Sequence, residues 1–220
     1  MTVKLNHYYS INPIKSKEYK KFVINKFIPG VNRLGMHTVA VWSVMVGAYS
    51  EIIFESVAND LDLLEKAMRN SEYQKLKNDL FNYIKNYQTK VLVKTGKVDA
   101  YSTDIREDTV KFNQMWDVVS EKQKEYDKFT NEEFYPVLNE LGITVAGEWE
   151  VLIGDGPRII CEGRATDVQN LIPNMQSRKM HQALRNLKFY VENYRSRILT
   201  FHIHKVKGYK SASYNLIWGG

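Results

Sequence analysis

The chain has 220 residues, of which 44% are hydrophobic and 25% charged, with a formal net charge of +6 at pH 7. This composition is that of a globular protein and excludes a largely disordered chain. No apolar run approaches the roughly 20 residues that span a bilayer, and no basic, apolar leader precedes the first alternating segment. The single cysteine, Cys161, permits no internal disulfide, so we expect a cytoplasmic protein without a membrane span.

The positive charge is concentrated in residues 1–97, which hold 15 Lys and Arg against 8 Asp and Glu. A basic region can attract an anionic partner. Here, however, the lysines fall mostly on the outer faces of predicted helices, and no nucleic-acid-binding motif accompanies them. We therefore interpret the charge as a solvated helix surface and do not expect a nucleic-acid partner.

An internal duplication is the most informative feature of the sequence. Residues 3–92 align with residues 110–199 at a constant offset of 107, without a gap. The matches run from end to end and include Lys17-Glu18-Tyr19 with Lys124-Glu125-Tyr126, Trp42 with Trp149, and Asn86-Tyr87 with Asn193-Tyr194. A repeat of this length is a whole small domain, too long to be one turn of a solenoid.

In chain order, each copy begins with an alternating segment, residues 3–11 in the first, which is typical of a half-buried strand. Apolar residues at helical spacing follow from Tyr19 to Ile28. Pro29 interrupts this helix and can begin a further turn, since proline is tolerated at the first helical position. Gly35 then stands where a left-handed C-cap is expected.

A hairpin and a second helix complete the copy. Residues 38–46 and 50–57 are rich in Val, Ile, Trp and Phe, and the turn Gly47-Ala48-Tyr49-Ser50 joins them. Asp60 is a candidate N-cap of a helix that we expect to reach about residue 87, followed by a strand over 89–97. The second copy repeats this pattern, with the turn Gly154-Asp155-Gly156-Pro157, the N-cap Asp167, a second helix to about residue 194 and a last strand over 197–207.

The order β-α-β-β-α-β is the ferredoxin-like split arrangement, so the predicted fold class is α+β. We predict a first repeat at 1–97, an acidic linker at 98–108, a second repeat at 109–207 and a C-terminal arm at 208–220. One such sheet carries helices on one face and leaves the other face uncovered. The duplication therefore predicts that the two antiparallel sheets pair into an α/β barrel with helices outside, an intrachain pseudo-dimer.

Two segments carry a resemblance to known proteins. The first is Phe-x-Pro-x-x-Asn-x-Leu-Gly at 27–35 and 134–142, and the second is Ala67-Met68-Arg69-Asn70-Ser71-Glu72-Tyr73-Gln74-Lys75-Leu76, which the second copy lacks. Both resemble the dimeric α/β-barrel superfamily, which includes NIPSNAP-like proteins, antibiotic-biosynthesis-type monooxygenases, muconolactone isomerases and chlorite dismutase-like haem proteins. The resemblance implies the same barrel and leaves a further homodimer open.

Candidate site residues are polar, and several are repeated in both copies. The identical pairs are Lys4 and Lys111, Asn6 and Asn113, and Glu55 and Glu162, all alternating with apolar residues. We assign Trp42, Val44, Trp149 and Val151 to the helix side of the sheets, which puts Val41, Ser43, Glu148 and Glu150 on the other face. Together, Lys, Asn and Glu can line a cavity where a carboxylate acts as acid or base. The alternative is a set of salt bridges at the rim.

His202 and His204 lie at i and i+2 on one face of the last strand, a geometry that some metal sites use, with Glu148 or Glu150 as a third ligand. The alternative is a pair of solvent-facing or core histidines. His181 invites comparison with the haem proteins of the superfamily, although nothing near it specifies haem. We expect no cofactor, with haem or a transition metal left open, and we interpret Cys161 as a small core hydrophobe.

Three functions remain open. In the first, favoured slightly, the barrel or its rim binds a small organic molecule without covalent chemistry. In the second, the resemblance implies a cofactor-independent monooxygenase or isomerase, with Glu55 or Glu162 as base and Asn6 or Asn113 orienting the substrate. In the third, NIPSNAP-like resemblance implies a protein-interaction module that uses the outer helices or the C-terminal arm.

Overall fold

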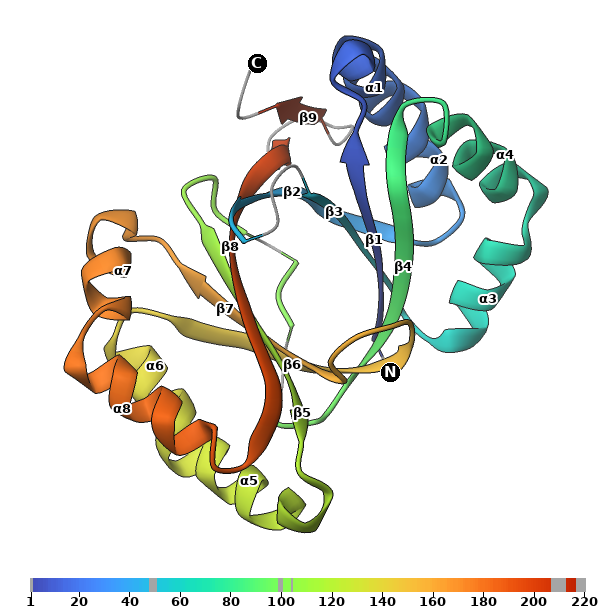
Figure 1. Cartoon of the computed structure of the whole chain (residues 1–220). Coiled ribbons are helices and arrows are strands. Elements are labelled where there is room, and N and C mark those ends of the chain that lie inside the picture. The colour runs from blue at the N-terminus through green and yellow to red at the C-terminus, as the bar shows by residue number, and fades with distance from the viewer. Residues whose placement is uncertain (1, 48–50, 99–100, 104, 207–212, 217–220) are drawn as a thin grey trace. The chain divides into compact units, whose positions relative to one another are not determined.

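A computed structural model of the chain describes residues 2–47, 51–98, 101–103, 105–206 and 213–216. The chain divides into two compact units (Figure 1). Unit 1 consists of Met1–Val44, Ala48–Val93 and Phe201–Gly220, and unit 2 consists of Met45–Gly47 and Lys94–Thr200. Each unit contains one copy of the duplicated sequence.

Unit 1 is a four-stranded antiparallel sheet with helices on one face (Figure 1). Its elements are β1 (Val3–Ile11), α1 (Ser16–Phe22), α2 (Ile28–Arg33), β2 (His37–Val46), β3 (Glu51–Ala58), α3 (Leu61–Arg69), α4 (Ser71–Leu80) and β4 (Ile84–Lys94). The strand order β2-β3-β1-β4 is that of the ferredoxin-like split arrangement, so the predicted fold class is confirmed for this unit.

Unit 2 repeats the same elements. They are β5 (Val110–Val118), α5 (Gln123–Phe129), α6 (Tyr135–Glu140), β6 (Thr144–Ile153), β7 (Ile159–Ala165), α7 (Val168–Met175), α8 (Arg178–Leu187) and β8 (Val191–Val206). The strand order is β6-β7-β5-β8, and the bounds of β5, α5, α6, β6 and α8 lie 107 residues after those of their counterparts. The duplication read from the sequence is therefore a duplication of structure. The closure of the two sheets into one barrel stays a prediction.

The first helix of each copy contains a π-helical turn just before its proline. In unit 1 the turn covers Val23–Phe27, and the N–H of Ile28 bonds to the carbonyl of Val23. Pro29 has no N–H, and its ring clashes with a helical carbonyl four residues back, so the wider turn accommodates it. The same turn, Thr130–Phe134, precedes Pro136.

The predicted end of the second helix is wrong in both copies. That helix is two helices, α3 and α4 or α7 and α8, capped where predicted by the side chains of Asp60 and Asp167. It ends at Leu80 or Leu187, and the next strand begins at Ile84 or Val191 rather than at 89 or 197. Asn86 and Asn193, expected in the helix, have φ of 56° and 54° and lie in a β-bulge of β4 or β8. A left-handed residue cannot continue a helix.

The turns were placed more accurately. Gly35 and Gly142 have φ of 85° and 76°, as a left-handed C-cap requires. β6 and β7 pair as a hairpin around Gly154-Asp155-Gly156-Pro157, and β2 pairs with β3 in the same way. Of the predicted turn between β2 and β3, only Gly47 lies within the described residues.

The core of each unit lies between its helices and one face of its sheet. In unit 1 this core contains Val3, Leu5, Val41 and Phe54, and in unit 2 it contains Val110, Phe112 and Cys161. The assignment of Trp42 and Trp149 to the helix side is therefore wrong. Successive side chains on a strand point to opposite faces. Val41 and Glu148 face the helices, and the neighbouring tryptophans face away from them.

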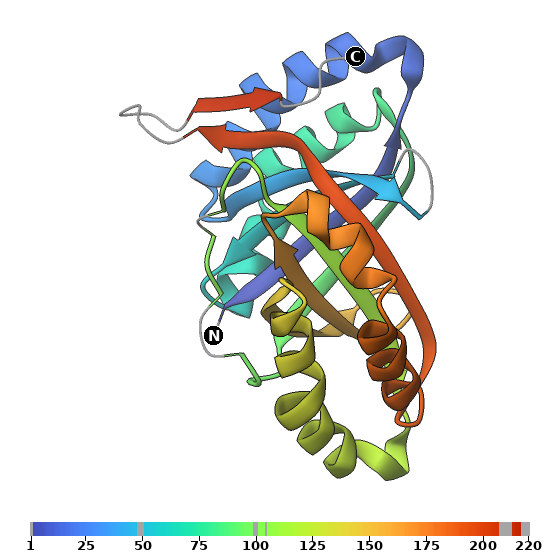
Figure 2. The same ribbon diagram turned by 90° about the vertical axis from the view of Figure 1, so that its left-hand side faces the viewer.

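The end of the chain belongs to unit 1. Phe201, near the end of β8, stacks on Trp42 with ring centroids 4.3 Å apart, and Ile203 lies in the core of unit 1. Strand β9 (Ser213–Leu216) pairs antiparallel with the end of β8 (Figure 2). The described part of the predicted C-terminal arm is thus a strand.

Within the described residues, no helix is both long and apolar enough to cross a membrane.

Candidate functional site

A buried ion pair lies on the face of the unit 1 sheet that points away from the helices. Lys4 Nζ lies 2.5 Å from Glu55 Oε1, and the two side chains are 1% and 0% exposed. Trp42 Nε1 donates a hydrogen bond of 2.8 Å to Glu55 Oε2. Asn6 stands directly opposite Glu55 in the register of β1 and β3 and is also buried.

Unit 2 contains the same pair. Lys111 Nζ lies 2.9 Å from Glu162 Oε2, and both side chains are 2% exposed. Arg164 Nη2 adds a second ion pair at 2.9 Å to Glu162 Oε1, to which the Tyr101 hydroxyl also donates, at 3.2 Å. Asn113 is opposite Glu162 in the register of β5 and β7.

The structure thus brings together six of the predicted site residues, as one Lys–Asn–Glu cluster in each unit. The salt bridges are buried rather than placed at a rim. The burial of a charged side chain lowers stability by on the order of several kcal/mol, unless the charge is paired and hydrogen-bonded. The partners above supply that compensation, so both clusters hold a permanently paired carboxylate against the sheet.

A pocket of about 980 Å³ lies in unit 2, at the edge of its sheet. Its walls come from Lys94–Lys97, the end of β5, the helical segment that begins at Ser120, the second half of β6 and the start of β7. The lining residues are Lys94, Thr95, Gly96, Lys97, Val118, Ser120, Gln123, Tyr126, Asp127, Asn131, Glu148, Glu150, Arg158 and Ile159. Two predicted ligand-binding residues, Glu148 and Glu150, therefore line one pocket.

Glu148 is the buried carboxylate of this pocket, at 2% exposure. The Tyr126 hydroxyl donates a hydrogen bond of 2.7 Å to Oε2, and the Tyr135 hydroxyl donates to the same oxygen. Lys97 Nζ lies 3.0 Å from Oε1 as an ion pair. That contact lacks hydrogen-bond geometry, so within the described part of the chain Oε1 accepts no hydrogen bond.

Lys97 is held in place by four contacts. Its Nζ also lies 2.8 Å from Asp127 Oδ1, donates at 3.2 Å to the Thr130 hydroxyl and sits 3.7 Å from the centre of the Tyr126 ring. The backbone before it is fixed too, because the Thr95 N–H donates to the Glu148 carbonyl at 3.2 Å. A lysine with this many partners presents its charge at a fixed position.

Burial sets the protonation of the groups around Glu148. It raises the pKa of the Tyr126 and Tyr135 hydroxyls well above the usual tyrosine value, and the neighbouring Glu148 charge raises the two pKa values further. Burial likewise raises the pKa of the Cys161 thiol. All three groups are therefore protonated at neutral pH, and the two tyrosines act as donors to Glu148.

Glu150 lies at the outer edge of the same pocket and pairs with Arg158, whose Nη2 is 3.1 Å away. Both side chains are more than 40% exposed. Such a pair contributes little binding energy by itself, because water screens it.

The predicted histidine pair is described only in part. His202 packs against Tyr19, with ring centroids 6.0 Å apart, and burial lowers the pKa of its imidazole to about 4. The side chain of His204 lies outside the described residues. Among those that are described, no group of three His, Cys, Asp or Glu is placed to hold a metal ion. His181 is exposed on α8, and Cys161 is a core residue of unit 2, as predicted.

Sequence reasoning missed Lys97, Tyr126, Tyr135 and Asp127. A signal for them was present in the alignment of the two copies. Tyr135 and Glu148 replace Ile28 and Val41, two buried apolar residues of the first copy. A polar residue at a core position in only one of the two copies is not needed for the shared fold, and it therefore indicates a candidate functional position.

No protein-family model matches the chain, and no curated protein matches it in sequence. Solved structures match it in fold. A candidate monooxygenase from Fusobacterium nucleatum is 10% identical over 91% of this chain and 92% of its own, with a TM-score of 0.66. An anthrone oxidase-like protein is 13% identical over 91% of this chain and 90% of its own, with a TM-score of 0.58.

A NIPSNAP family protein from Agrobacterium tumefaciens aligns with 44% of this chain and 95% of its own, at 19% identity and a TM-score of 0.37. The neighbours thus include both monooxygenase-like and NIPSNAP proteins, as the sequence motifs predicted. At these identities the similarity establishes the fold, tandem ferredoxin-like repeats of mixed α+β class.

Proposed function

We propose that the protein binds a small polar organic molecule in the unit 2 pocket, with Glu148 and Lys97 as its recognition groups. The observation that carries this proposal is a buried carboxylate at the wall of a pocket of about 980 Å³, within the size range of ligand sites. Glu148 Oε1 is buried and accepts no hydrogen bond within the described part of the chain, so it can take a ligand donor once the side chains that cover it move aside, and Lys97 can donate to a ligand acceptor.

The surroundings favour a hydroxylated aromatic ligand. The Tyr126 ring and the side chains of Val118 and Ile159 supply apolar surface in the same pocket. A phenolic hydroxyl that donates to Glu148 Oε1 would satisfy the carboxylate completely, with the aromatic ring on the apolar wall. Dihydroxynaphthalenes combine both features and are suitable probes.

Ligand-observed NMR with a set of dihydroxynaphthalenes tests this proposal. We expect binding to the wild-type protein and at least a tenfold loss of affinity in Glu148→Gln, which exchanges a charged acceptor for a neutral amide. Glu133→Gln, on the outer helices of the same unit, is the matched control and is expected to bind like wild type. Unchanged affinity in Glu148→Gln, or no binding by the wild type, contradicts the proposal.

A second candidate function is cofactor-independent oxygenation or isomerisation. The buried Lys4–Glu55 and Lys111–Glu162 pairs favour it, because each places a carboxylate next to a cation and an asparagine. In this reaction Glu55 or Glu162 removes a proton from a carbon beside a carbonyl, and Asn6 or Asn113 orients the substrate. The anthrone oxidase-like neighbour suggests the probe.

Oxygen uptake in the presence of anthrone tests this second function. Oxidation of anthrone by dioxygen gives anthraquinone and water, so one molecule of oxygen is consumed per anthrone. We expect the rate above the uncatalysed background to fall at least a hundredfold in Glu55→Gln or in Glu162→Gln, on the scale of a lost general base. A wild-type rate equal to the background rules the function out for this substrate. The third reading, a protein-interaction module, stays a prediction.

A further inference from the structure

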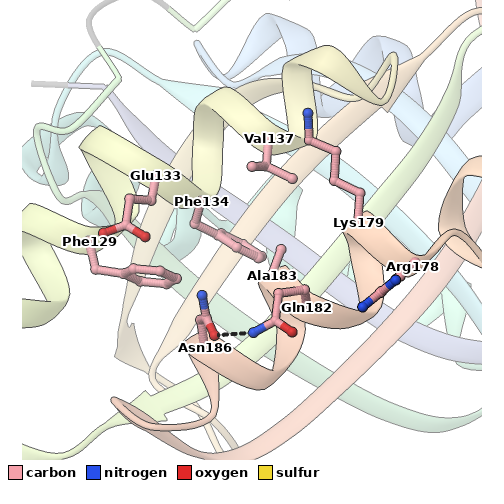
Figure 3. Close-up of a pocket in the computed structure, with 9 residues that line it drawn as sticks. All are labelled: Phe129, Glu133, Phe134, Val137, Arg178, Lys179, Gln182, Ala183 and Asn186. Carbon is pink, nitrogen blue, oxygen red and sulfur yellow. Dashed lines mark hydrogen bonds between the residues drawn. The ribbon is translucent and has the colours of Figure 1, made fainter.

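A second pocket, separate from the Glu148 pocket, lies on the helical surface of unit 2 (Figure 3). It has a volume of about 470 Å³ and runs between α8 and the helical segment from α5 to α6. Its apolar floor is formed by Phe129, Phe134, Val137 and Ala183. We call it the helix groove; it shares no lining residue with the Glu148 pocket.

The counterpart region of unit 1 is packed differently. The floor phenylalanines recur as Phe22 and Phe27, but the positions of Val137 and Ala183 are held by Gly30 and Leu76. Leu76 lies directly over Gly30, since a Cβ built on that glycine would be 2.3 Å from Leu76 Cδ1. In unit 2 the side chain on α8 is shortened to a methyl group and Val137 adds bulk on α6, so the floor of the groove is built from both helices.

Opposite charges stand at the two ends of the helix groove. Glu133 lies beside Phe129 on one side, and Arg178 lies on the opposite side (Figure 3). Among the described side chains, neither takes part in an ion pair or hydrogen bond, whereas the adjacent Lys179 is paired with Glu140. In unit 1 the two positions are Lys26 and Ser71, so this charge pattern belongs to unit 2 alone.

We infer that the helix groove binds a small zwitterionic molecule with an apolar middle, its anionic group at Arg178 and its cationic group at Glu133. The floor takes the apolar part, and each unpaired end charge gains a partner of opposite sign. The stretch of α8 that lines the groove, from Arg178 to Asn186, spans about 12 Å at 1.5 Å per residue. An extended ω-amino acid of eight carbons is about as long.

Titration of the whole protein with 8-aminooctanoic acid, octanoic acid and octylamine, followed by amide NMR shifts, tests the inference. We expect shifts along α8 and about two- to fivefold tighter binding of the zwitterion than of either singly charged compound, the effect of one further exposed ion pair. Equal affinities for the three compounds, or shifts confined to other parts of the chain, overturn the inference.

Residues of the other copy supply the variants. The double variant Val137→Gly with Ala183→Leu gives unit 2 the residues of unit 1 at these positions. It is expected to lower the affinity for all three compounds at least fivefold. Arg178→Ser should weaken the binding of octanoic acid but not that of octylamine. Glu133→Lys should weaken the binding of octylamine but not that of octanoic acid. Unchanged affinity in these surface variants overturns the inference even if the double variant fails to fold. Because Glu148 is not involved, Glu148→Gln should leave this binding unchanged whatever its effect on the dihydroxynaphthalenes.

Discussion

Unit 1 holds Ile28, Val41 and Phe54 where unit 2 holds Tyr135, Glu148 and Cys161, on the same elements and all close to the same helices. Both units keep the buried Lys–Glu pair on the opposite face of the sheet. The shared features are those that the scaffold needs in both copies. At these matching positions only unit 2 has a polar cluster, and buried polar groups that packing does not require are expected at functional sites.

The same comparison extends to other positions. His7 of unit 1 accepts or donates a hydrogen bond of 2.8 Å with the Tyr87 hydroxyl, and Gln114 accepts one of 2.9 Å from Tyr194 at the matching places. Arg33 pairs with Glu72 in unit 1, and Glu140 pairs with Lys179 in unit 2, so the charges are exchanged. Each difference supplies a variant that the other copy already tolerates.

The largest expected effect is the loss of a partner in the buried ion pairs. Lys4→Met leaves the Glu55 carboxylate in a buried site without its lysine, and we expect unfolding free energy to fall by about 3–5 kcal/mol. Lys111→Met should cost unit 2 less, because Arg164 remains as a cationic partner of Glu162. Urea unfolding measures both. Addition of Glu55→Met to Lys4→Met should restore most of the loss, and single-variant losses below about 1 kcal/mol would contradict this account of the pairs.

The next effect is a dependence of stability on pH that is specific to unit 1. Burial, with a smaller contribution from Lys77, lowers the pKa of His7 to about 3, against about 6.5 for an unfolded chain. The unfolded state therefore takes up the proton first, so stability is full above pH 6.5 and declines as the pH falls toward 3. At pH 5 the loss should be about 2 kcal/mol relative to pH 7.5.

His7→Gln tests this dependence, because it copies Gln114 and can keep the hydrogen bond to Tyr87. Urea unfolding at pH 7.5 and pH 5 should show a smaller loss in the variant than in the wild type. His202, whose pKa is also lowered by burial, accounts for part of the remainder. An equal loss in the two proteins would mean that His7 is not the source.

Smaller effects are expected at the left-handed asparagines of the β-bulges. Alanine tolerates positive φ less well than asparagine, so Asn86→Ala and Asn193→Ala should each destabilise by about 1 kcal/mol. Glycine has no such penalty, and Asn86→Gly or Asn193→Gly should lie close to wild type. Thermal unfolding of the four variants measures the contrast, and an alanine variant as stable as its glycine counterpart would contradict the backbone assignment.

The smallest effect concerns the exchanged surface pairs. Arg33→Glu with Glu72→Lys gives unit 1 the charge arrangement of unit 2, and its stability should match wild type. The coupling energy in a double-mutant cycle is expected to be about 0.2–1 kcal/mol and to shrink in 1 M salt. A coupling that salt leaves unchanged would show that these pairs act through packing rather than charge.

Much of the fold was predictable because its signals are local. The alternation of residues 3–11, the glycine C-caps and the aspartate N-caps each depend on a few neighbouring residues. The helix end near Asn86 was predicted wrongly. The conformation of Asn86 is set by the pairing of β4 with β1, and the local sequence around Asn86 does not reveal that pairing. The face of β2 was misjudged because Trp42 and Val41 are both apolar, and only Glu55 and Phe201 show which side the tryptophan occupies.

The site divides in the same way. The Lys–Asn–Glu clusters were predictable from identity between the copies, since repeated polar residues on one strand face point to a shared role. Lys97 could not be predicted in this way. It lies after the last strand of the first copy, and only the tertiary structure brings it next to Glu148. Glu148 was found for the wrong reason, as a residue on the face of β6 that points away from the helices. Differences between the copies at buried positions carry that information better than identities do.

Amide NMR of the labelled protein during titration with a dihydroxynaphthalene tests the central proposal, that the ligand binds in the Glu148 pocket of the second copy. The shift changes should concentrate at Gln123–Asn131 and around Glu148, and the matching positions of the first copy, 16–24 and around Val41, should stay unchanged. Equal shifts in both copies, or shifts in the first copy only, would contradict the proposal.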